Sequence, residues 1–453
     1  MKPFFAPASV AIIGASRHPQ KVGNVILKNL LNAHFKGKIY PINPSTATVL
    51  DLPCYPSVLA VKEKIETAII SVPSSLTPQV LEQCGQKGIK NIIMVTAGFS
   101  EIGNKELDQN ILSIIKKYGM RMVGPNCLGT LDTYSGFDNL FLPRSRLTRP
   151  DPGVISFICQ SGAVGSATLD LLSKEGMKFA KFVSYGNALD VDESDLLHYL
   201  GSDPQTKIIC LYIEGIKDGK KFMKIAREVA KKKPVIAIKG GITNAGAKAA
   251  LSHTASLAGA AGIYKAAFKQ SNVIFAENLE DLFNYAKILE KCPRPKGPRV
   301  QIITNGGGFG ILATDALSSC NMEIIEATES TKKYLRPKLP PEAALHNPLD
   351  LTGSVTTEHY KFALNALLED KNVDMILLIV LLQTPLITPE IIDVIKEAKR
   401  KHSKKPIAVI STGGNFTDIY VRKIEDLGIP CYAYPNNAAR ALRALYEYYH
   451  KKK

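Results

Sequence analysis

His253 lies in a run of small and hydroxyl-bearing residues, Leu251-Ser252-His253-Thr254-Ala255-Ser256-Leu257-Ala258-Gly259. A glycine- and alanine-rich stretch precedes this run, and a segment with helical spacing, Ala260 to Gln270, follows it. Imidazole changes its charge near neutral pH, and its free base is a good nucleophile. A histidine on such a loop could accept a chemical group and carry it elsewhere. The alternative is an ordinary surface histidine beside serines and threonines.

A second candidate for chemistry follows the first apolar segment, Val10 to Ile13. It continues into Gly14-Ala15-Ser16-Arg17 and then into helical spacing. A strand, a tight glycine turn and a helix N-terminus together form an anion site. The run lacks the full GxGxxG pattern, and the next strand ends near Asn43 without an acid for an NAD ribose. Arg17 and Lys21 instead suit a phosphate-rich adenosine ligand. The alternative is a glycine needed only for packing.

Three more turns follow apolar segments and are expected to line the same crevice. Ligands of open α/β sheets bind outside the carboxyl ends of the strands. Cys127 has no basic neighbour in the sequence, so we expect a packing or wall residue rather than a nucleophile. The expected lining residues are Val72 and Pro73 in the first turn, Ala97 and Gly98 in the second, and Asn126 in the third.

The composition excludes several classes of protein. The net charge is +16, but the basic residues are spread along the chain and Trp is absent, so we expect no nucleic-acid partner. This balance suits anionic ligands such as nucleotides and coenzyme A, or a heat-adapted surface. No apolar run approaches the roughly 20 residues that span a bilayer, and no signal-peptide core is present. The eight cysteines show no metal spacing. We therefore expect a cytoplasmic protein without a membrane segment or metal.

The elements that position these residues alternate between short apolar strands and helical segments. This alternation predicts an α/β fold of three consecutive doubly wound parallel-sheet domains. The expected domains are residues 1–145, 146–292 and 293–453, separated by two proline-rich stretches. The expected strands are Val10–Ile13, Lys38–Ile42, Ala68–Val72, Asn91–Val95, Met122–Val123, Val154–Ile158, Phe179–Val183, Ile208–Ile213, Val235–Ile238, Val300–Ile303, Met375–Val380 and Ala408–Ile410.

Taken together, the motifs resemble the nucleoside-diphosphate-forming acyl-CoA synthetases, which include ADP-forming acetate–CoA ligase and, more distantly, succinyl-CoA synthetase. The resemblance covers almost the whole chain in the family's order. It implies a Rossmann-like CoA-binding first domain and flavodoxin-like second and third domains. Ala255 and Phe309 depart from the family, which usually has glycine and proline there. The shared runs are Ile13-Gly14-Ala15-Ser16-Arg17, Gly124-Pro125-Asn126-Cys127-Leu128-Gly129, Cys159-Gln160-Ser161-Gly162-Ala163, Ser184-Tyr185-Gly186-Asn187, Tyr212-Ile213-Glu214-Gly215, Ser252 to Gly259, Thr304 to Gly310 and Asn347 to Leu351.

The resemblance implies the reversible reaction of acyl-CoA, phosphate and ADP to carboxylic acid, CoA and ATP. Phosphate attacks the thioester and forms an acyl phosphate, whose phosphoryl group passes to His253 and then to ADP. Phosphate is expected at Gln160, Ser161 and Gly162, where a strand meets a helix N-terminus. An ordinary serine N-cap is the alternative there. Glu214 is expected to accept a hydrogen bond from His253 Nδ1, or else to pair with a lysine.

The family's nucleotide-grasp domain has no counterpart in this sequence, and no Walker A run replaces it. The resemblance therefore implies an α subunit whose separate β subunit binds Mg-ADP or Mg-ATP, in an α2β2 assembly. A succinyl-type ligase α subunit is a first alternative, which the third block disfavours. A non-catalytic CoA-binding regulator is a second, which the presence of both His253 and Glu214 disfavours. The acids Asp190, Asp192, Glu193 and Asp195 either position a site loop or complement a helix N-terminus.

Overall fold

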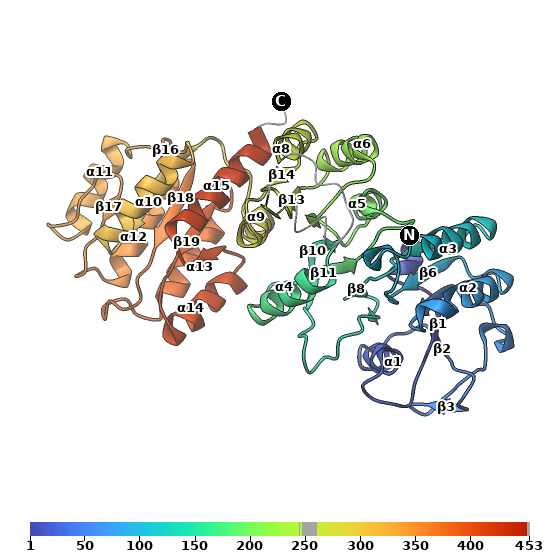
Figure 1. The fold of residues 1–453 in the computed structure, drawn as a ribbon. Helices are drawn as coiled ribbons and strands as arrows, with labels where there is room; N and C mark the ends of the chain where they lie inside the picture. The colour runs from blue at the N-terminus through green and yellow to red at the C-terminus, as the bar shows by residue number, and fades with distance from the viewer. Residues whose placement is uncertain (244, 247–260, 451–453) are drawn as a thin grey trace. The chain divides into compact units, whose positions relative to one another are not determined.

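The structure is a computed structural model that describes residues 1–243, 245–246 and 261–450. The chain divides into two compact units, Met1–Phe275 and Ala276–Lys453. Unit 1 contains two large sheets and a small β3–β4 pair (Thr48–Val49 and Leu52–Pro53), and unit 2 contains one sheet (Figure 1). The α/β class is confirmed, whereas the boundaries after residues 145 and 292 remain a prediction.

The first sheet of unit 1 has five parallel strands in the order β2-β1-β5-β6-β7. Counted along the chain, this order is 2-1-3-4-5, which is that of a doubly wound sheet. The strands are β1 (Ser9–Ile13), β2 (Lys38–Ile42), β5 (Thr67–Ile70), β6 (Asn91–Met94) and β7 (Arg121–Val123), and the helices are α1 (Val22–Asn32), α2 (Thr77–Gln86) and α3 (Lys105–Lys117).

Burial on both faces explains why these strands read as continuous apolar runs. Val10 and Ile12 of β1 pack in a core that includes Leu30 of α1. Ala11 and Ile13 point to the opposite face, in a core that includes residues of α2 and α3. Successive side chains of a strand alternate between faces, so a strand covered on both sides must be apolar at every position.

The second sheet of unit 1 has the order β14-β13-β12-β10-β11-β8-β9. Its five parallel strands again follow the order 2-1-3-4-5, while β8 and β9 form an antiparallel edge. The strands are β8 (Gly129–Asp132), β9 (Phe137–Asp138), β10 (Pro152–Cys159), β11 (Phe179–Ser184), β12 (Ile208–Ile213), β13 (Val235–Lys239) and β14 (Ile274–Phe275), and the helices are α4 (Gly162–Lys174), α5 (Glu193–Ser202), α6 (Gly219–Ala230) and α8 (Ala261–Gln270).

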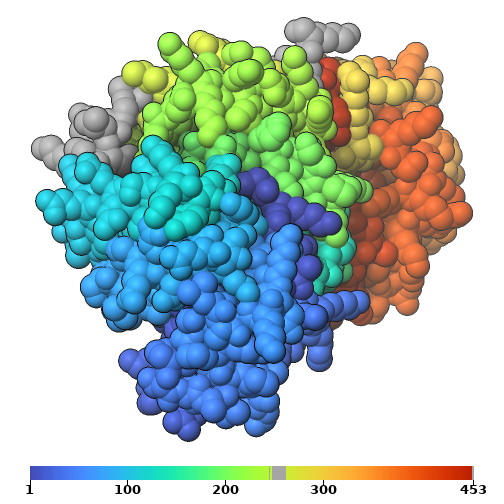
Figure 2. Space-filling view, turned by 90° about the vertical axis from the view of Figure 1, so that its right-hand side faces the viewer, coloured from blue at the N-terminus to red at the C-terminus, as the bar shows by residue number. Residues whose placement is uncertain are grey.

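The N-terminal segment of the chain joins the two sheets of unit 1. Figure 2 shows this dark-blue segment between the light-blue and the green surface. The ring of Phe5 stacks on Tyr199 of α5 with centroids 5.3 Å apart, and Thr67 and Thr130 each donate a hydrogen bond to a backbone carbonyl of the segment. Residues of both sheets therefore share one core.

Unit 2 repeats the same strand order in a third parallel sheet, β16-β15-β18-β19-β20, with β17 paired to β15. Helices α9 and α15 pack on each other, and Asp281 of α9 forms an ion pair with Arg440 of α15. The strands are β15 (Arg299–Thr304), β16 (Glu323–Ile324), β17 (Leu349–Asp350), β18 (Met375–Ile379), β19 (Ile407–Ile410) and β20 (Cys431–Tyr432), and the helices are α9 (Leu279–Lys291), α10 (Gly307–Ser319), α11 (Glu329–Leu335), α12 (Thr357–Glu369), α13 (Ile391–Lys401), α14 (Asn415–Asp426) and α15 (Pro435–His450).

The strand order places a switch point in each sheet of unit 1, where neighbouring strands send their chains to opposite faces. In the first sheet it lies between β1 and β5, with Ile13 opposite Ile70. In the second it lies between β10 and β12, with Cys159 opposite Tyr212. The turn after each strand of such a pair begins at the same level, so a crevice opens between the two turns.

Candidate active site at two sheet edges

The first switch point holds a cavity of about 440 Å³. The turn at Gly14 has a φ of +94°, and a Cβ there would lie 2.8 Å from the Ser71 carbonyl oxygen. A side chain at this position would therefore be strained and would collide with the neighbouring turn. The lining residues are Gly14, Ser16, Lys21, Val22, Gly23, Ser71, Val72, Pro73, Val95, Thr96, Ala97 and Phe141.

Six of the eleven expected ligand residues of the first domain line this cavity: Gly14, Ser16, Lys21, Val72, Pro73 and Ala97. Asn43 supports the turn: its Nδ2 donates to the Ala15 carbonyl oxygen at 2.6 Å, and its Oδ1 accepts from Ser45 N. Ala15 itself is buried, and Arg17 is exposed. Gly98 donates its N–H to Glu101 Oε1 at 2.6 Å. The N–H groups of Gly14 and Ala15 are engaged with the Ile42 carbonyl oxygen, so the crevice offers Lys21 and the first turn of α1, with Val22 and Gly23 in its lining, to a phosphate-bearing ligand.

The second switch point holds a cavity of about 670 Å³, which the structure forms from both sheets of unit 1. Val95, Ala97 and Phe141 line this cavity as well as the first, so the two cavities meet at a shared wall. The expected phosphate residues and Glu214 lie together here, along with Asn126. The lining residues are Val95, Ala97, Glu101, Asn126, Cys127, Leu128, Phe141, Leu142, Gln160, Ser161, Gly162, Ala163, Ser166, Gly186, Asn187 and Glu214.

Ser161 is the N-cap of α4, and its Oγ accepts a hydrogen bond from Val164 N at 3.3 Å. The first N–H groups of α4 point toward the cavity end of the helix, where the helix dipole favours an anion. Gly162, the first residue of the helix, lines the cavity without a side chain. Ser161 is therefore an N-cap, as the alternative interpretation expected. The cavity in front of the same helix end also leaves room for an anion.

Gln160 connects the two turns of this switch point. Its Oε1 accepts hydrogen bonds from Glu214 N at 2.7 Å, from Gly215 N at 3.1 Å and from the Tyr185 hydroxyl at 3.3 Å. Three donors on one oxygen identify it as the carbonyl oxygen of the amide. Gln160 Nε2 donates to no other described residue, and Gln160 lines the cavity.

Glu214 lies half-buried directly after β12, with its carboxylate beside the Tyr212 hydroxyl, which hydrogen-bonds to it. Burial and the charge of Glu214 raise the pKa of Tyr212. The backbone at Gly240 approaches both side chains, because a Cβ at Gly240 would lie 2.7 Å from Tyr212 Oη and 3.6 Å from Glu214 Cγ. Glu214 therefore lies beside Gly240, the first residue after β13, where the segment that contains His253 begins. His253 and Ala255 themselves lie outside the described residues.

Two polar residues of the cavity wall were not expected from the sequence. Glu101 Oε1 accepts from Gly98 N and Phe99 N, and its Oε2 accepts from Asn187 Nδ2 at 2.6 Å. These hydrogen bonds outweigh the effect of burial and lower the pKa of Glu101. Asn187 ends the shared run Ser184-Tyr185-Gly186-Asn187, so its position in this motif could have identified it as a residue of the site. Glu101 lies in a loop without such a signal.

Cys127 is a wall residue, in agreement with the sequence-based interpretation. Its thiol is buried and donates to the Met94 carbonyl oxygen at 3.3 Å. Burial raises the pKa of Cys127 to about 12, so little thiolate forms at neutral pH. A nucleophilic role is not supported by this environment.

The acidic cluster after Asn187 is engaged in local structure. Asp192 caps α5 and pairs with Lys221, while Asp190 and Asp195 both pair with Arg121. Glu193 is buried at the start of α5, and burial raises its pKa to about 7. These contacts favour the helix-terminus interpretation over a site loop. Within the described residues, no group of three or more His, Cys, Asp or Glu side chains could hold a metal, and no helix could span a membrane.

Substitutions of Ser161 separate capping from anion binding. Ser161→Ala should cost about 1 kcal/mol of unfolding free energy, because the cap is lost. Ser161→Asp should keep the stability within about 0.5 kcal/mol, since aspartate is an equally good cap, but should weaken the binding of inorganic phosphate more than tenfold through repulsion. Denaturant unfolding and calorimetric titration with phosphate measure the two effects. Unchanged phosphate affinity in Ser161→Asp would show that the anion does not bind at α4.

Comparison with known proteins relates all three sheets to one enzyme family. Models of a CoA binding domain, a succinyl-CoA ligase like flavodoxin domain and a Ligase-CoA domain match residues 8–133, 152–289 and 300–451. The α subunits of ADP-forming acetate–CoA ligases I and II of Pyrococcus furiosus are each 39% identical to this chain, over 99% and 98% of it and 97% and 96% of their own lengths.

A longer relative and a solved structure agree with this relationship. The ADP-forming acetate–CoA ligase of Methanocaldococcus jannaschii is 44% identical over 98% of this chain, which spans 62% of that protein. The dinucleotide-forming acetyl-coenzyme A synthetase 1 of Ca. Korarchaeum cryptofilum, solved with phosphate and ADP, superposes with a TM-score of 0.93 at 38% identity, covering 99% of this chain and 96% of that one. The chain therefore belongs to the family of ADP-forming acetate–CoA ligase α subunits.

Proposed function

We propose that this chain converts acyl-CoA, most readily acetyl-CoA, and phosphate to a carboxylic acid, CoA and a phosphohistidine, and passes the phosphoryl group to ADP. The observation that carries the proposal is the shared wall between the two cavities of unit 1. The first crevice suits the phosphates of coenzyme A, and the second presents a helix N-terminus and Gln160 to an anion. A thioester at the junction would lie beside the phosphate that attacks it.

A phosphate oxygen attacks the thioester carbon, the C–S bond breaks, and CoA leaves as the thiol. The free ring nitrogen of His253 then attacks the phosphorus of the acyl phosphate, and the carboxylate leaves with the electrons of the P–O bond. ADP finally takes the phosphoryl group from the histidine. The carrier divides one difficult transfer into two easier ones and links thioester and nucleotide sites that lie apart.

The proposal assigns the nucleotide step to a separate β subunit that binds Mg-ADP or Mg-ATP, in an α2β2 assembly. Support comes from the absence of a phosphate-binding Walker A run in the sequence and from the names of the Pyrococcus furiosus relatives, which are called α subunits. The cytoplasmic location likewise stays a prediction, with which the free state of all eight cysteines is in keeping.

The proposal is tested by incubating the purified full chain with acetyl-CoA and radiolabelled phosphate. We expect a protein-bound phosphoryl group that is labile in acid and stable in base, that depends on acetyl-CoA, and that maps to the peptide containing residues 251–259. If no label forms with acetyl-CoA or succinyl-CoA, even after the partner subunit is added, the proposal is wrong and CoA binding alone would describe the chain. Labelling with succinyl-CoA in preference to acetyl-CoA would overturn the proposed acyl group.

Glu214→Gln tests the carboxylate at the end of β12. The substitution keeps the size of the side chain and leaves the backbone contact with Gln160 intact, but it removes the charge that orients and stabilises an imidazolium. We expect labelling to slow by about 100-fold or more. The exposed Glu175→Gln variant is the control and should label at the parent rate. Normal labelling in Glu214→Gln would show that this carboxylate is not needed.

A further inference from the structure

Glu101 connects a loop of the first sheet of unit 1 to a turn of the second sheet. Its loop follows β6, and its Oε1 accepts hydrogen bonds from Gly98 N at 2.6 Å and from Phe99 N at 3.2 Å in that loop. The other carboxylate oxygen, Oε2, accepts from Asn187 Nδ2 at 2.6 Å. Asn187 lies in the turn after β11, in the second sheet. One carboxylate thus bridges two sheets, and the proposed function gives it no task.

Asn187 is fixed through both its side chain and its backbone. Burial would raise the pKa of Glu101, but its hydrogen bonds lower the pKa overall, so the carboxylate is ionised and only accepts. The amide of Asn187 must therefore turn its nitrogen toward Glu101, and its Oδ1 accepts from Asn126 Nδ2 at 3.3 Å. The backbone N–H of Asn187 donates to the Pro125 carbonyl oxygen at 3.0 Å, and its carbonyl oxygen accepts from Lys217 Nζ at 3.1 Å.

The contact between Glu101 and Asn187 lies where the two cavities of unit 1 meet. Both residues line the second cavity, and Ala97, in the same loop as Glu101, lines both cavities. The hydrogen bonds within the loop shape it on the side of the first crevice, and the hydrogen bond to Asn187 fixes it against the second sheet. The contact is therefore part of the link between the first crevice and the N-terminus of α4.

We propose that Glu101 is a positioning residue for the attack on the thioester: its contact with Asn187 holds the turns of the two sheets where thioester and phosphate meet. This role rests on the proposed function, which places the thioester at the junction of the cavities and the phosphate at α4. Other groups bind the two reactants, so loss of the contact would leave each bound but misplaced relative to the other. A misplacement of about 1 Å between reacting groups can slow a reaction about 100-fold.

Glu101→Gln breaks the contact and keeps the loop. The amide oxygen can still accept from Gly98 N and Phe99 N, but the amide nitrogen faces Asn187 Nδ2, and two donors cannot pair. We expect labelling by radiolabelled phosphate, with acetyl-CoA and phosphate both saturating, to slow by about 10- to 100-fold. Calorimetric titration with acetyl-CoA alone and with inorganic phosphate alone should give dissociation constants close to those of the parent chain. A slower reaction with unchanged binding of each reactant is the signature of misplacement.

Asn187→Asp, combined with Glu101→Gln, restores the contact with donor and acceptor exchanged. Asn187→Asp alone sets two carboxylates against each other and should slow labelling at least as much as Glu101→Gln. In the double variant the amide nitrogen at position 101 donates to the carboxylate at position 187, which can still accept from Asn126 Nδ2. We expect the double variant to recover most of the parent rate. Recovery would distinguish the contact from a direct action of the Glu101 carboxylate on the reactants.

Glu82→Gln is the matched control, because Glu82 also joins two elements of unit 1 but lines neither cavity. Its Oε2 accepts from Lys117 Nζ at 2.9 Å and from the Tyr118 hydroxyl at 2.7 Å, which ties α2 to the end of α3. This variant should label at the parent rate. Thermal unfolding of each variant shows whether it is folded at the assay temperature.

The outcomes separate this role from the proposed function. If the parent chain labels and Glu101→Gln labels equally fast, or if Glu82→Gln slows labelling as much, the role of Glu101 is wrong and the function stands. A slow Glu101→Gln variant that Asn187→Asp does not rescue, or that has lost the binding of acetyl-CoA or phosphate, also overturns the role, since the contact would not act by positioning. If the parent chain does not label at all, the proposed function fails and the role of Glu101 falls with it.

Discussion

Replacing His253 by alanine should abolish the phosphorylated form of the protein while leaving the earlier step intact. In the proposed sequence, phosphate attacks the thioester before the histidine takes part. The variant should therefore release CoA and form acyl phosphate, but it should carry no acid-labile label. The loss should be complete, because no other group can replace a covalent carrier. Protein-bound radioactivity and free thiol are measured in the same incubation.

The control for this experiment is a histidine in unit 1 that lies away from the two cavities. His198 is exposed on α5 and lines neither of them, so His198→Ala should label like the parent chain. Label that persists in His253→Ala would place the carrier elsewhere. Loss of CoA release together with loss of label would assign His253 to the attack on the thioester, contrary to the proposed order of steps.

The long parallel strands were predictable from the sequence, because burial on both faces makes them continuous apolar runs. Lys38–Ile42 and Ile208–Ile213 were predicted with the observed limits, and each of the other predicted strands corresponds to an observed one with limits shifted by a residue or two. The switch points were predictable as well, because Gly14, Gln160 and Glu214 directly follow such runs. The local sequence is enough to predict a strand and the turn after it where the strand and the following helix both have a clear hydrophobic pattern.

The short edge strands were not predictable in this way. Strands β9, β14, β16, β17 and β20 have two residues each, too few to show a period. The run from Gly124 to Gly129 was interpreted as a turn, but Gly129 begins β8, which pairs antiparallel with β11. That pairing depends on contacts between residues far apart in the sequence, such as Asp132 with Lys181, and these contacts leave no local signal.

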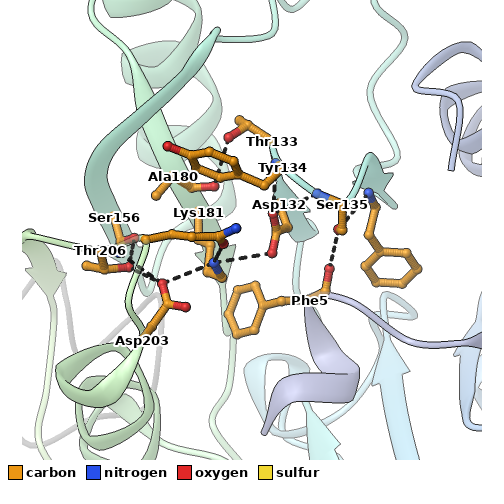
Figure 3. A network of polar contacts seen from close by, with 12 residues as sticks. Phe5, Asp132, Thr133, Tyr134, Ser135, Ser156, Ala180, Lys181, Asp203 and Thr206 are labelled. Atoms are coloured by element: carbon orange, nitrogen blue, oxygen red, sulfur yellow. Dashed lines mark hydrogen bonds and ion pairs between the residues drawn. The ribbon is translucent and has the colours of Figure 1, made fainter. Parts of the chain in front are cut away.

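The contact between Asp132 and Lys181 belongs to a buried polar network that joins β8, β11 and the segment between α5 and β12 (Figure 3). Lys181 Nζ lies 3.0 Å from Asp203 Oδ2, 2.5 Å from Gln205 Oε1 and 3.3 Å from Asp132 Oδ2, and only 2% of its side chain is exposed. Asp203 Oδ2 also accepts from Thr206 N and Oγ1. One ammonium group thus serves two buried carboxylates.

Lys181→Met should lower the unfolding free energy of unit 1 by about 3–5 kcal/mol, the largest stability effect that we expect for a single substitution in this chain. The reason is the uncompensated charge that remains, because removal of one partner leaves buried carboxylates facing each other without a cation. Denaturant unfolding measures the difference.

Two further variants identify the origin of this loss. Lys178→Met removes an exposed lysine just before the same strand and should change the stability by no more than about 0.5 kcal/mol. Adding Asp132→Asn and Asp203→Asn to Lys181→Met removes all three charges and should recover part of the stability, because whole buried ion pairs can often be replaced at little cost. If the triple variant is no more stable than Lys181→Met, the loss comes from packing of the lysine stem rather than from charge. The antiparallel edge formed by β8 would then depend on the shape of that side chain and not on its ammonium group.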